Sequence, residues 1–304
     1  MSPTNQKLSD QVSSGEVLFR ELTKELIDPL AKDLAQEVKW IPLKGISSKT
    51  DNYPVVITGQ GNPLLLLHGF DSSFLEFRRL VPLLKKNHLL IIPDLYGFGF
   101  CPRPVDVDFG PEAIFQHLRE LLERVIPFSR PVGLIGASMG GAVAMELGRR
   151  YPERIQRLLL LAPAGLTGKP MPLPPGLDQL GVWFLSRPFV RRSLCRQAFS
   201  DPDLSVGEKE EQIASLHLSV PGWGRSLSSF ARSGGMANCG SPLPDKAINV
   251  IFGKNDRILS STIKKQVHKL LDPNVEELKD CGHLPHLDCP EFVARRWLEF
   301  SRSV

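Results

Sequence analysis

The sequence has no apolar run long enough to cross a bilayer. Its most apolar runs, LLLL at 64–67 and LLLLA at 158–162, have the length of β-strands, whereas a membrane-spanning helix needs about 20 apolar residues. The initial MSPTNQKLSDQ lacks the apolar stretch of a secretory signal and the arginine-rich character of a transit peptide. These absences predict a cytoplasmic protein without a transmembrane segment.

The sequence also has little net charge and no closely paired cysteines. The 304 residues carry a formal net charge of +4, which is too small at this length to indicate a nucleic-acid partner. The five cysteines are odd in number and none forms a C-x-x-C pair, so reduced thiols are expected rather than a disulfide framework. The hydrophobic share of 42% and the charged share of 23% are those of an ordinary globular protein.

Short β-type runs alternate with helical patterns from residue 39 onward. Several of these runs are apolar throughout, among them PLLLLH, HLLIIPD, PVGLIGAS, RLLLLAPA and AINVIFG. Continuous apolar runs are typical of parallel strands with helices on both faces of the sheet. The alternation therefore predicts an α/β fold with a mostly parallel, doubly wound sheet.

Two segments depart from this alternation. The first residues have helical patterns, with a break expected at Asp28-Pro29. A later stretch combines the proline-rich KPMPLPPG, helical patterns and the loop SGGMANCGSPLP between two strand signals. We therefore expect an N-terminal helical extension at residues 1–38, a core formed by 39–165 and 245–304, and an inserted helical cap at 166–244.

The sequence GLIGASMGGAVAMELGRRYP, residues 133–152, places a serine where a strand pattern meets a helix pattern. Gly136-Ala137-Ser138-Met139-Gly140 is a G-x-S-x-G motif in the strand–turn–helix context that gives it meaning. Glycines on both sides allow a sharp turn around a strained central residue. The motif predicts that Ser138 is a nucleophile, the alternative being an idle serine in a tight turn.

A second turn follows the apolar run in LLLLHGF, residues 64–70. Attack on a carbonyl needs N–H donors aimed at the developing oxyanion, and one such donor contributes roughly 10²–10³ in rate. The backbone N–H groups of Phe70 and Met139 are the candidate donors. His68 is expected to hold the loop in place.

Several segments together resemble the α/β-hydrolase superfamily over roughly residues 50–304: PLLLLHGF, PDLYGFGFCPRP, GASMGGAVAMELGRRYPERI, VIFGKNDRI and GHLPHLDCPEFV. The stretch HGFDSSFLEFRR resembles cyanobacterial and plastid members, some of which cleave long-chain esters. The resemblance implies the α/β-hydrolase fold and the chain order nucleophile, acid, histidine. The serine at the elbow differs from the aspartate of dehalogenases and epoxide hydrolases with this fold.

Asp256 and His283 occupy the acid and histidine positions of this order. Asp256 follows the strand run AINVIFG, and His283 follows the glycine of DCGHLPHLDC. In these roles His283 takes the Ser138 proton, while Asp256 orients the imidazole. The alternatives are that Asp256 only caps a turn and that His286 is the base.

The same ten residues, DCGHLPHLDC, also raise the question of a metal site. A zinc site needs four converging ligands, which would be Cys281, His283, His286 and Cys289. These residues lack the paired spacing of zinc modules. We therefore expect no metal, and expect both cysteines to be small buried residues.

The predicted cap is basic and apolar between Asp178 and Asp201, where no acidic residue occurs. One interpretation is a surface that faces anionic lipid or an acidic substrate. The other is a helix with a solvated basic face and a buried apolar face. The arginines of this stretch stand at positions 187, 191, 192 and 196.

Taken together, these features predict a serine hydrolase that needs no cofactor. It would cleave a carboxylic ester, small or lipid-like, with a hydrophobic acyl or alcohol part, through an acyl-enzyme on Ser138. Peripheral membrane contact through the cap is compatible with this prediction. The alternatives are a carbon–carbon bond hydrolase with the same triad, and a ligand-binding or receptor-type protein with little turnover.

Overall fold

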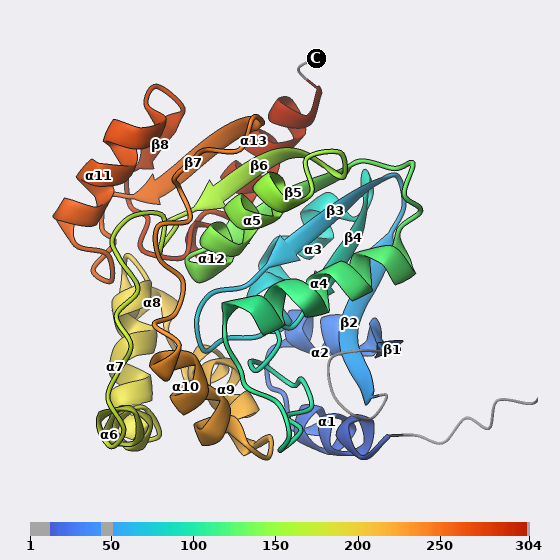
Figure 1. Cartoon of the computed structure of the whole chain (residues 1–304), viewed down its shortest axis with the longest axis vertical. Coiled ribbons are helices and arrows are strands. Elements are labelled where there is room, and N and C mark those ends of the chain that lie inside the picture. The colour runs from blue at the N-terminus through green and yellow to red at the C-terminus, as the bar shows by residue number, and fades with distance from the viewer. Residues whose placement is uncertain (1–12, 44–50, 303–304) are drawn as a thin grey trace, which may run out of the picture.

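The computed structural model describes residues 13–43 and 51–302, which are built around one eight-stranded sheet (Figure 1). The strand order is β1-β2-β4-β3-β5-β6-β7-β8. Strand β2 runs antiparallel to β1 and β4, and all other neighbouring pairs are parallel. The predicted α/β fold with a mostly parallel sheet is therefore confirmed. No helix within these residues combines the length and the apolar character needed to cross a membrane.

The strands are β1 Val38–Leu43, β2 Asp51–Gly59, β3 Asn62–Leu67, β4 His88–Pro93, β5 Val132–Ala137, β6 Ile155–Leu161, β7 Ala247–Gly253 and β8 Val275–Leu278. The helices that accompany the sheet are α3 Val81–Leu84, α4 Pro111–Val125, α5 Met139–Arg150, α11 Ser261–Leu271, α12 Pro285–Asp288 and α13 Pro290–Arg302, with the 3-10 helix η1 at Phe74–Arg79.

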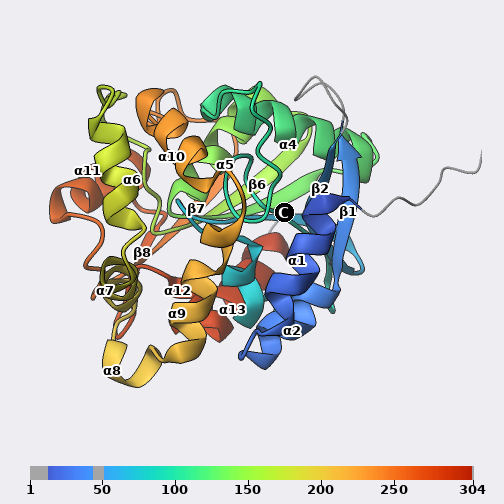
Figure 2. The same cartoon turned by 90° about the horizontal axis from the view of Figure 1, so that it is seen from below.

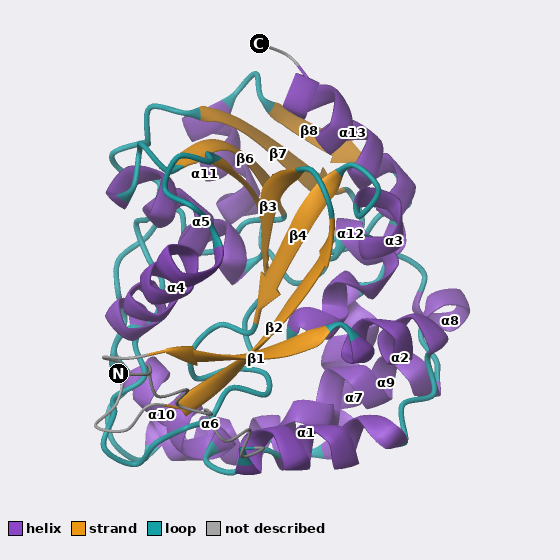
Figure 3. Ribbon diagram, turned by 90° about the vertical axis from the view of Figure 1, so that its right-hand side faces the viewer, coloured by secondary structure: helices purple, strands orange, loops and turns teal. Residues whose placement is uncertain are grey.

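Helices cover both faces of the sheet, with α4, α5 and α11 on one side and α3, α12 and α13 on the other (Figure 3). The run of four leucines in β3 shows why its sequence does not alternate. Leu65 and Leu67 are buried in the apolar cluster that includes α4 and α5, whereas Leu64 and Leu66 are buried in the cluster that includes α13. Each side of the strand meets a core, so both sides are apolar.

The N-terminal segment forms α1 Ser14–Lys24 and α2 Pro29–Gln36, which lie alongside β1 and β2 at one side of the molecule (Figure 2). The expected break at Asp28-Pro29 is present, because the Asp28 carboxylate accepts the N–H of Leu30 at 2.8 Å and caps α2. The other Asp28 oxygen accepts from Nε of Arg78 at 2.8 Å. This buried ion pair attaches the extension to η1.

Five helices lie between β6 and β7: α6 Leu177–Leu185, α7 Pro188–Ala198, α8 Pro202–Ser205, α9 Glu208–Ser215 and α10 Trp223–Arg232, with the 3-10 helix η2 at Leu216–Ser219. They gather beyond the carboxyl ends of the parallel strands (Figure 1). We propose that residues 166–244 act as a cap, and call them the cap segment below.

Candidate active site

Ser138 stands between β5 and α5 in a strained backbone conformation. Its φ of 50° and ψ of −117° lie outside the regions that residues other than glycine ordinarily adopt. Backbone bonds hold the turn, since Ser138 N–H donates to the Leu161 carbonyl at 2.8 Å and its carbonyl accepts from Ala164 N–H at 3.0 Å. The end of β6 therefore fixes the elbow (residues 136–140).

Close backbone contacts explain the glycines of this motif. A Cβ atom added at Gly140 would lie 2.1 Å from the Leu67 carbonyl oxygen, and one added at Gly136 would lie 2.3 Å from the Gly140 carbonyl oxygen. Neither contact leaves room for a side chain. A side chain at either position would therefore require the neighbouring backbone to shift.

Asp256 and His283 come together from the loops after β7 and β8. His283 Nδ1 lies 3.0 Å from Asp256 Oδ2, and the other Asp256 oxygen accepts the N–H groups of Ile258 and Leu259 at 2.8 and 3.0 Å. Burial raises the pKa of Asp256, but the contact with His283 and these two N–H bonds outweigh it and leave the pKa below its usual value. An ionised Asp256 keeps the proton on Nδ1 and leaves Nε2 as the basic atom.

His283 is also attached to the cap segment, because its N–H donates to the Ala198 carbonyl at 2.8 Å. Within residues 13–43 and 51–302, no hydrogen bond joins its ring to the Ser138 hydroxyl. Such bonds are often long in enzymes without substrate and tighten when it binds. The structure thus shows the contact between Asp256 and His283 directly, whereas proton transfer between His283 and Ser138 would need the two side chains to move closer.

The loop of residues 68–71, called the oxyanion loop below, runs beside the elbow. A Cβ atom added at Gly69 would lie 3.3 Å from the Cβ of Ser138. Among the described residues, no atom accepts a hydrogen bond from the N–H of Phe70 or of Met139. Met139 is also the first residue of α5, where unpaired N–H groups concentrate positive charge.

His68 holds the oxyanion loop, as its place in the sequence predicts. Its Nε2 accepts the Leu95 N–H at 2.9 Å, so Nδ1 carries the proton and donates to the Gly69 carbonyl at 2.7 Å. Burial lowers the pKa of His68, which favours this neutral form. Asp94 is likewise structural, since its oxygens accept the N–H groups of Phe74 and Phe100 at 2.7 and 2.6 Å.

The second histidine of DCGHLPHLDC faces a different carboxylate. His286 Nε2 lies 3.3 Å from Oε1 of Glu76, and its ring packs against Phe77 with 5.0 Å between ring centroids. Cys281 is buried as expected, whereas Cys289 is only half-buried, and neither thiol is in a disulfide. Within the described part of the chain, no group of three or more His, Cys, Asp or Glu side chains is arranged to hold a metal ion.

The sequence did not indicate a role for the buried carboxylate at the end of the oxyanion loop. Asp71 follows Phe70 directly and binds Arg191, His217 and Trp223 of the cap segment. These partners lie 120 to 152 residues further along the chain. The local signal is limited to an aspartate after HGF, and nothing in the sequence pairs it with the cap.

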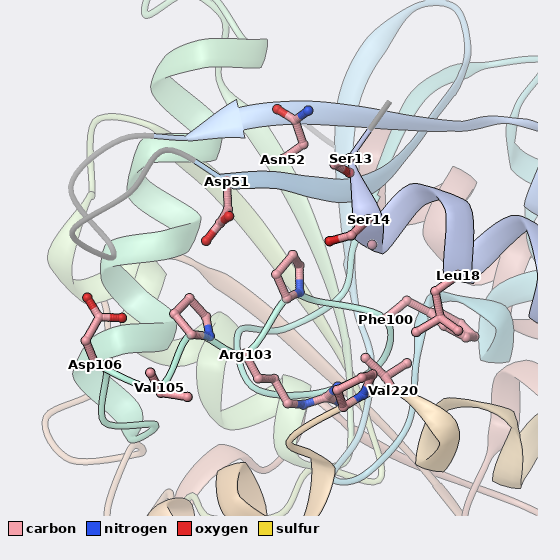
Figure 4. Close-up of a pocket in the computed structure, with 14 residues that line it drawn as sticks. Ser13, Ser14, Leu18, Asp51, Asn52, Phe100, Arg103, Val105, Asp106 and Val220 are labelled. Atoms are coloured by element: carbon pink, nitrogen blue, oxygen red, sulfur yellow. The ribbon is translucent and has the colours of Figure 1, made fainter. Parts of the chain in front are cut away.

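A cavity of about 620 Å³ lies elsewhere, between α1, the start of β2 and the loop of residues 100–106. Figure 4 shows Ser14 and Leu18 on one side of it and Val105 and Asp106 on the opposite side. Its lining includes Val220 of the cap segment but none of the candidate catalytic residues. This cavity is therefore separate from the acid–histidine pair.

Comparison with known proteins identifies the family. The model of the Alpha/beta hydrolase family matches residues 64–296. The chain is 32% identical over 289 residues to the alpha/beta hydrolase domain-containing protein VTE7 of Arabidopsis thaliana, which covers 90% of this chain and 86% of the relative. It is 39% identical over 257 residues to Lipase 1 of Psychrobacter immobilis, covering 80% and 78%. It is 27% identical over 240 residues to a 2-hydroxy-6-oxo-2,4-heptadienoate hydrolase of Pseudomonas putida, covering 74% and 83%.

Proposed function

Because the chain belongs to the alpha/beta hydrolase family, we propose that it is a serine hydrolase that cleaves a carboxylic ester with a hydrophobic acyl or alcohol part. The observation that carries this proposal is the 3.0 Å contact between His283 Nδ1 and Asp256 Oδ2. That pair follows the carboxyl ends of β7 and β8, at the sheet edge where the strained Ser138 follows β5. The three residues proposed as acid, base and nucleophile thus follow strands that end at the same edge of the sheet.

In this mechanism the Ser138 hydroxyl attacks the ester carbonyl while its proton moves to Nε2 of His283. Asp256 stabilises the resulting imidazolium, and the N–H groups of Phe70 and Met139 hold the oxyanion. Collapse of the tetrahedral intermediate expels the alcohol, which takes the proton from His283. Water then gives a proton to His283 and attacks the acyl-enzyme. The second tetrahedral intermediate releases the acid, and His283 returns its proton to the Ser138 oxygen.

Aromatic rings beside the oxyanion loop support a lipophilic substrate. The half-exposed Phe70 ring lies 5.6 Å from the ring of Phe98 and 5.9 Å from that of Phe230, measured between centroids. Each CH₂ group of a substrate that is buried against such rings contributes about 0.8 kcal/mol to the free energy of binding. The likeness to a protein named Lipase 1 supports the same substrate class.

A carbon–carbon bond hydrolase is the second candidate. A relative named for hydrolysis of 2-hydroxy-6-oxo-2,4-heptadienoate matches 74% of this chain. The same serine, histidine and oxyanion donors serve attack on a ketone carbonyl, so the triad alone does not decide the bond. A receptor-type protein with little turnover is the third candidate, and it would bind a ligand tightly without releasing product.

Rates on matched substrates separate these candidates. Purified protein is given p-nitrophenyl esters with acyl chains of increasing length and, separately, a 2-hydroxy-6-oxo-dienoate, with Ser138→Ala as control. We expect ester hydrolysis that rises with acyl length and disappears in Ser138→Ala. Faster turnover of the dienoate would favour the carbon–carbon candidate. Ester release equal in wild type and Ser138→Ala would contradict the proposal.

We further propose that helix α6 contacts a lipid surface. Its apolar side chains Leu177, Leu180, Trp183 and Phe184 are 50 to 57% exposed, and Phe189 at the start of α7 is 68% exposed. We call these five residues the α6 patch. Monomeric soluble proteins rarely leave contiguous apolar surface of this kind open to water.

One arginine beside the α6 patch, Arg187, favours an anionic lipid surface over another apolar partner. The Arg187 guanidinium lies over the Trp183 ring at 4.2 Å from its centroid, and Asp178 is buried against Arg232. The arginines of the cap segment do not form one basic face, because Arg191 is buried and Arg192 pairs with Glu211. Arg187 and the aromatic rings beside it thus form the membrane-facing part of the patch.

Sedimentation with vesicles tests the α6 patch. We expect binding to vesicles that contain phosphatidylglycerol, and a loss of at least tenfold in the double variant Trp183→Ser with Phe184→Ser. The matched control, Phe128→Ser with Leu204→Ser, removes residues that are 72% and 85% exposed outside the patch and should bind like wild type. Equal loss in both variants would contradict the proposal. Dimerisation abolished by the first variant would instead assign the patch to a second copy of the chain.

A further inference from the structure

Asp71 combines an unusual backbone conformation with a buried charge. It directly follows Phe70, whose N–H is one of the two proposed oxyanion donors. Its φ of 48° lies in the left-handed region that residues other than glycine rarely adopt, and its side chain is buried. A backbone conformation of this kind persists only when its surroundings impose it.

Three elements of the cap segment supply those surroundings. Oδ1 of Asp71 accepts from Nε1 of Trp223 on α10 at 2.8 Å and lies 3.0 Å from Nε2 of His217 on η2. Oδ2 accepts from Nη1 of Arg191 on α7. All three partner side chains are buried. One carboxylate therefore joins the oxyanion loop to three separate parts of the cap segment.

The charges at this carboxylate are balanced. Burial raises the pKa of Asp71, but the contacts with His217, Arg191 and Trp223 outweigh it and hold the pKa below its usual value. Burial lowers the pKa of His217, and its Nδ1 has no hydrogen-bond partner among the described residues. A neutral His217 that donates through Nε2 and a cationic Arg191 satisfy the ionised Asp71.

The opposite end of the oxyanion loop is anchored in the core. Gly69 N–H donates to Oε1 of Glu76 at 3.2 Å, and the His68 ring binds the Gly69 carbonyl. Phe70 thus lies between a core anchor at Gly69 and a cap anchor at Asp71. The Phe70 N–H shares a peptide plane with the Gly69 carbonyl that His68 holds, and Phe70 is joined on its other side to Asp71.

We propose that Asp71 is a positioning residue that aims the Phe70 N–H at the oxyanion when the cap segment is seated. The cap would then do more than cover the substrate, because its placement completes the oxyanion hole. This inference rests on the proposed function of Ser138 and deepens it. It assigns to Arg191, His217 and Trp223 a role in the stabilisation of the transition state without any contact to the substrate.

The test compares transition-state affinity with substrate affinity. A trifluoromethyl ketone forms a tetrahedral oxyanion on the serine, so its affinity depends on the oxyanion hole, whereas an ether analogue of the ester does not form one. In Asp71→Asn, an NH₂ group replaces one oxygen of the carboxylate, so the side chain loses its charge and can no longer accept from all three partners in the cap segment. Loss of a whole oxyanion donor costs roughly 10²–10³ in rate, so we expect misalignment to lower kcat about 10- to 100-fold.

We expect ketone affinity to fall by the same factor as kcat/KM, with KM and ether affinity changed less than threefold. Arg191→Met should show the same pattern, and Arg191→Lys, which keeps the charge, should restore part of the rate. The matched control is Asp178→Asn, which weakens an ion pair of the cap segment at 3.0 Å between the buried Asp178 and the exposed Arg232 without touching the oxyanion loop. It should leave ketone affinity unchanged.

Two outcomes would overturn the inference. One is unchanged ketone affinity in both Asp71→Asn and Arg191→Met while they remain folded by circular dichroism. The other is an equal loss in Asp178→Asn, which would mean that any loosening of the cap has this effect. If the wild type neither hydrolyses the ester nor binds the ketone, the proposed function itself fails and this inference falls with it. An active wild type with unaffected variants overturns only the role of Asp71.

Discussion

The two proposed oxyanion donors belong to regions that are held in place in different ways. The elbow is fixed by backbone hydrogen bonds to the end of β6 and by glycines packed against neighbouring backbone. The oxyanion loop is fixed by side chains, with Glu76 and His68 on the core side and the partners of Asp71 on the cap side. In this proposal the Met139 donor is positioned by the sheet, whereas the Phe70 donor is positioned by the core and the cap segment together.

The two regions are therefore expected to differ in the substitutions that they accept. The backbone contacts at Gly140 leave no space for an added atom, so we expect any substitution there to disturb the elbow. The side-chain anchors of the oxyanion loop can be replaced one at a time, with graded effects. Variants in the two regions, and in the residues around them, test this difference.

The largest effect is expected at Asp256, because it orients His283, the proposed general base. His283 contacts Asp256 through its ring and the cap segment through its N–H. Asp256→Asn removes the charge that stabilises the imidazolium and favours the wrong tautomer, so kcat should fall by about 10³–10⁴. Steady-state rates on a p-nitrophenyl ester measure this, and a fall of less than tenfold would contradict the assignment of Asp256.

The same variant has an expected pH signature in stability. The pKa of Asp256 is lowered in the folded state, so its stabilising contribution is present above the unfolded value of about 3.9 and is lost as pH falls through the folded value. Wild type should therefore lose stability more steeply than Asp256→Asn below about pH 4. Thermal unfolding between pH 3 and 7 compares the two slopes, and parallel slopes would disagree with this expectation.

The next effect is expected from Gly140→Ala, which alters the elbow alone. Its Cβ atom would lie 2.1 Å from the Leu67 carbonyl oxygen, so β3 or α5 must shift. We expect a loss of about 2–3 kcal/mol in the free energy of unfolding, the upper part of the range for overpacking, together with a large fall in kcat. Urea unfolding gives the first value, and wild-type stability would show that the elbow is less closely packed than described.

A smaller effect is expected from His286→Gln, on the core anchor of the oxyanion loop. His286 contacts Glu76, which binds the Gly69 N–H, and a glutamine amide can still donate to that carboxylate. We expect kcat to fall less than about tenfold, against roughly 10²–10⁴ for loss of general-base catalysis in His283→Gln. Equal losses in the two variants would reopen the choice of base between these histidines.

The smallest effect on activity is expected from Asp28→Asn, which lies outside both regions. The variant keeps an acceptor for the α2 cap but loses the charge that faces Arg78. We expect a loss of about 1.5–3 kcal/mol in the free energy of unfolding, the range for a hydrogen bond to a charged group, with kcat within twofold of wild type. A large fall in kcat at unchanged stability would show that the N-terminal helices reach the active site.

The sequence predicted the elbow more completely than the oxyanion loop, for a physical reason. Ser138 and its glycines are neighbours in the chain, and residues 133–152 also contain the strand and helix patterns on either side of them. The order of acid and histidine after the serine came from the family resemblance, and the contact between Asp256 and His283 agrees with it. Strand and helix positions along the core followed the apolar runs closely.

The sequence predicted that the cap segment interrupts the alternation of strands and helices, but it did not predict the contacts that the segment makes. Its arginines look alike in the sequence, yet Arg191 is buried at Asp71, Arg187 stacks on Trp183 and Arg192 pairs with Glu211. These differences depend on which face of a short helix meets the core, and one sequence carries little information about that. The link between Asp71 and residues more than a hundred positions away depends on tertiary structure alone.

The most direct test of the account is covalent labelling of the serine by a fluorophosphonate, followed by intact mass and peptide mapping. We expect a single adduct on the peptide that contains Ser138, none in Ser138→Ala, and labelling slowed by roughly 10²–10⁴ in His283→Gln, the contribution of general-base catalysis. Labelling of Ser138→Ala at the wild-type rate, or of wild type at another residue, would contradict the central claim that Ser138 is the activated nucleophile.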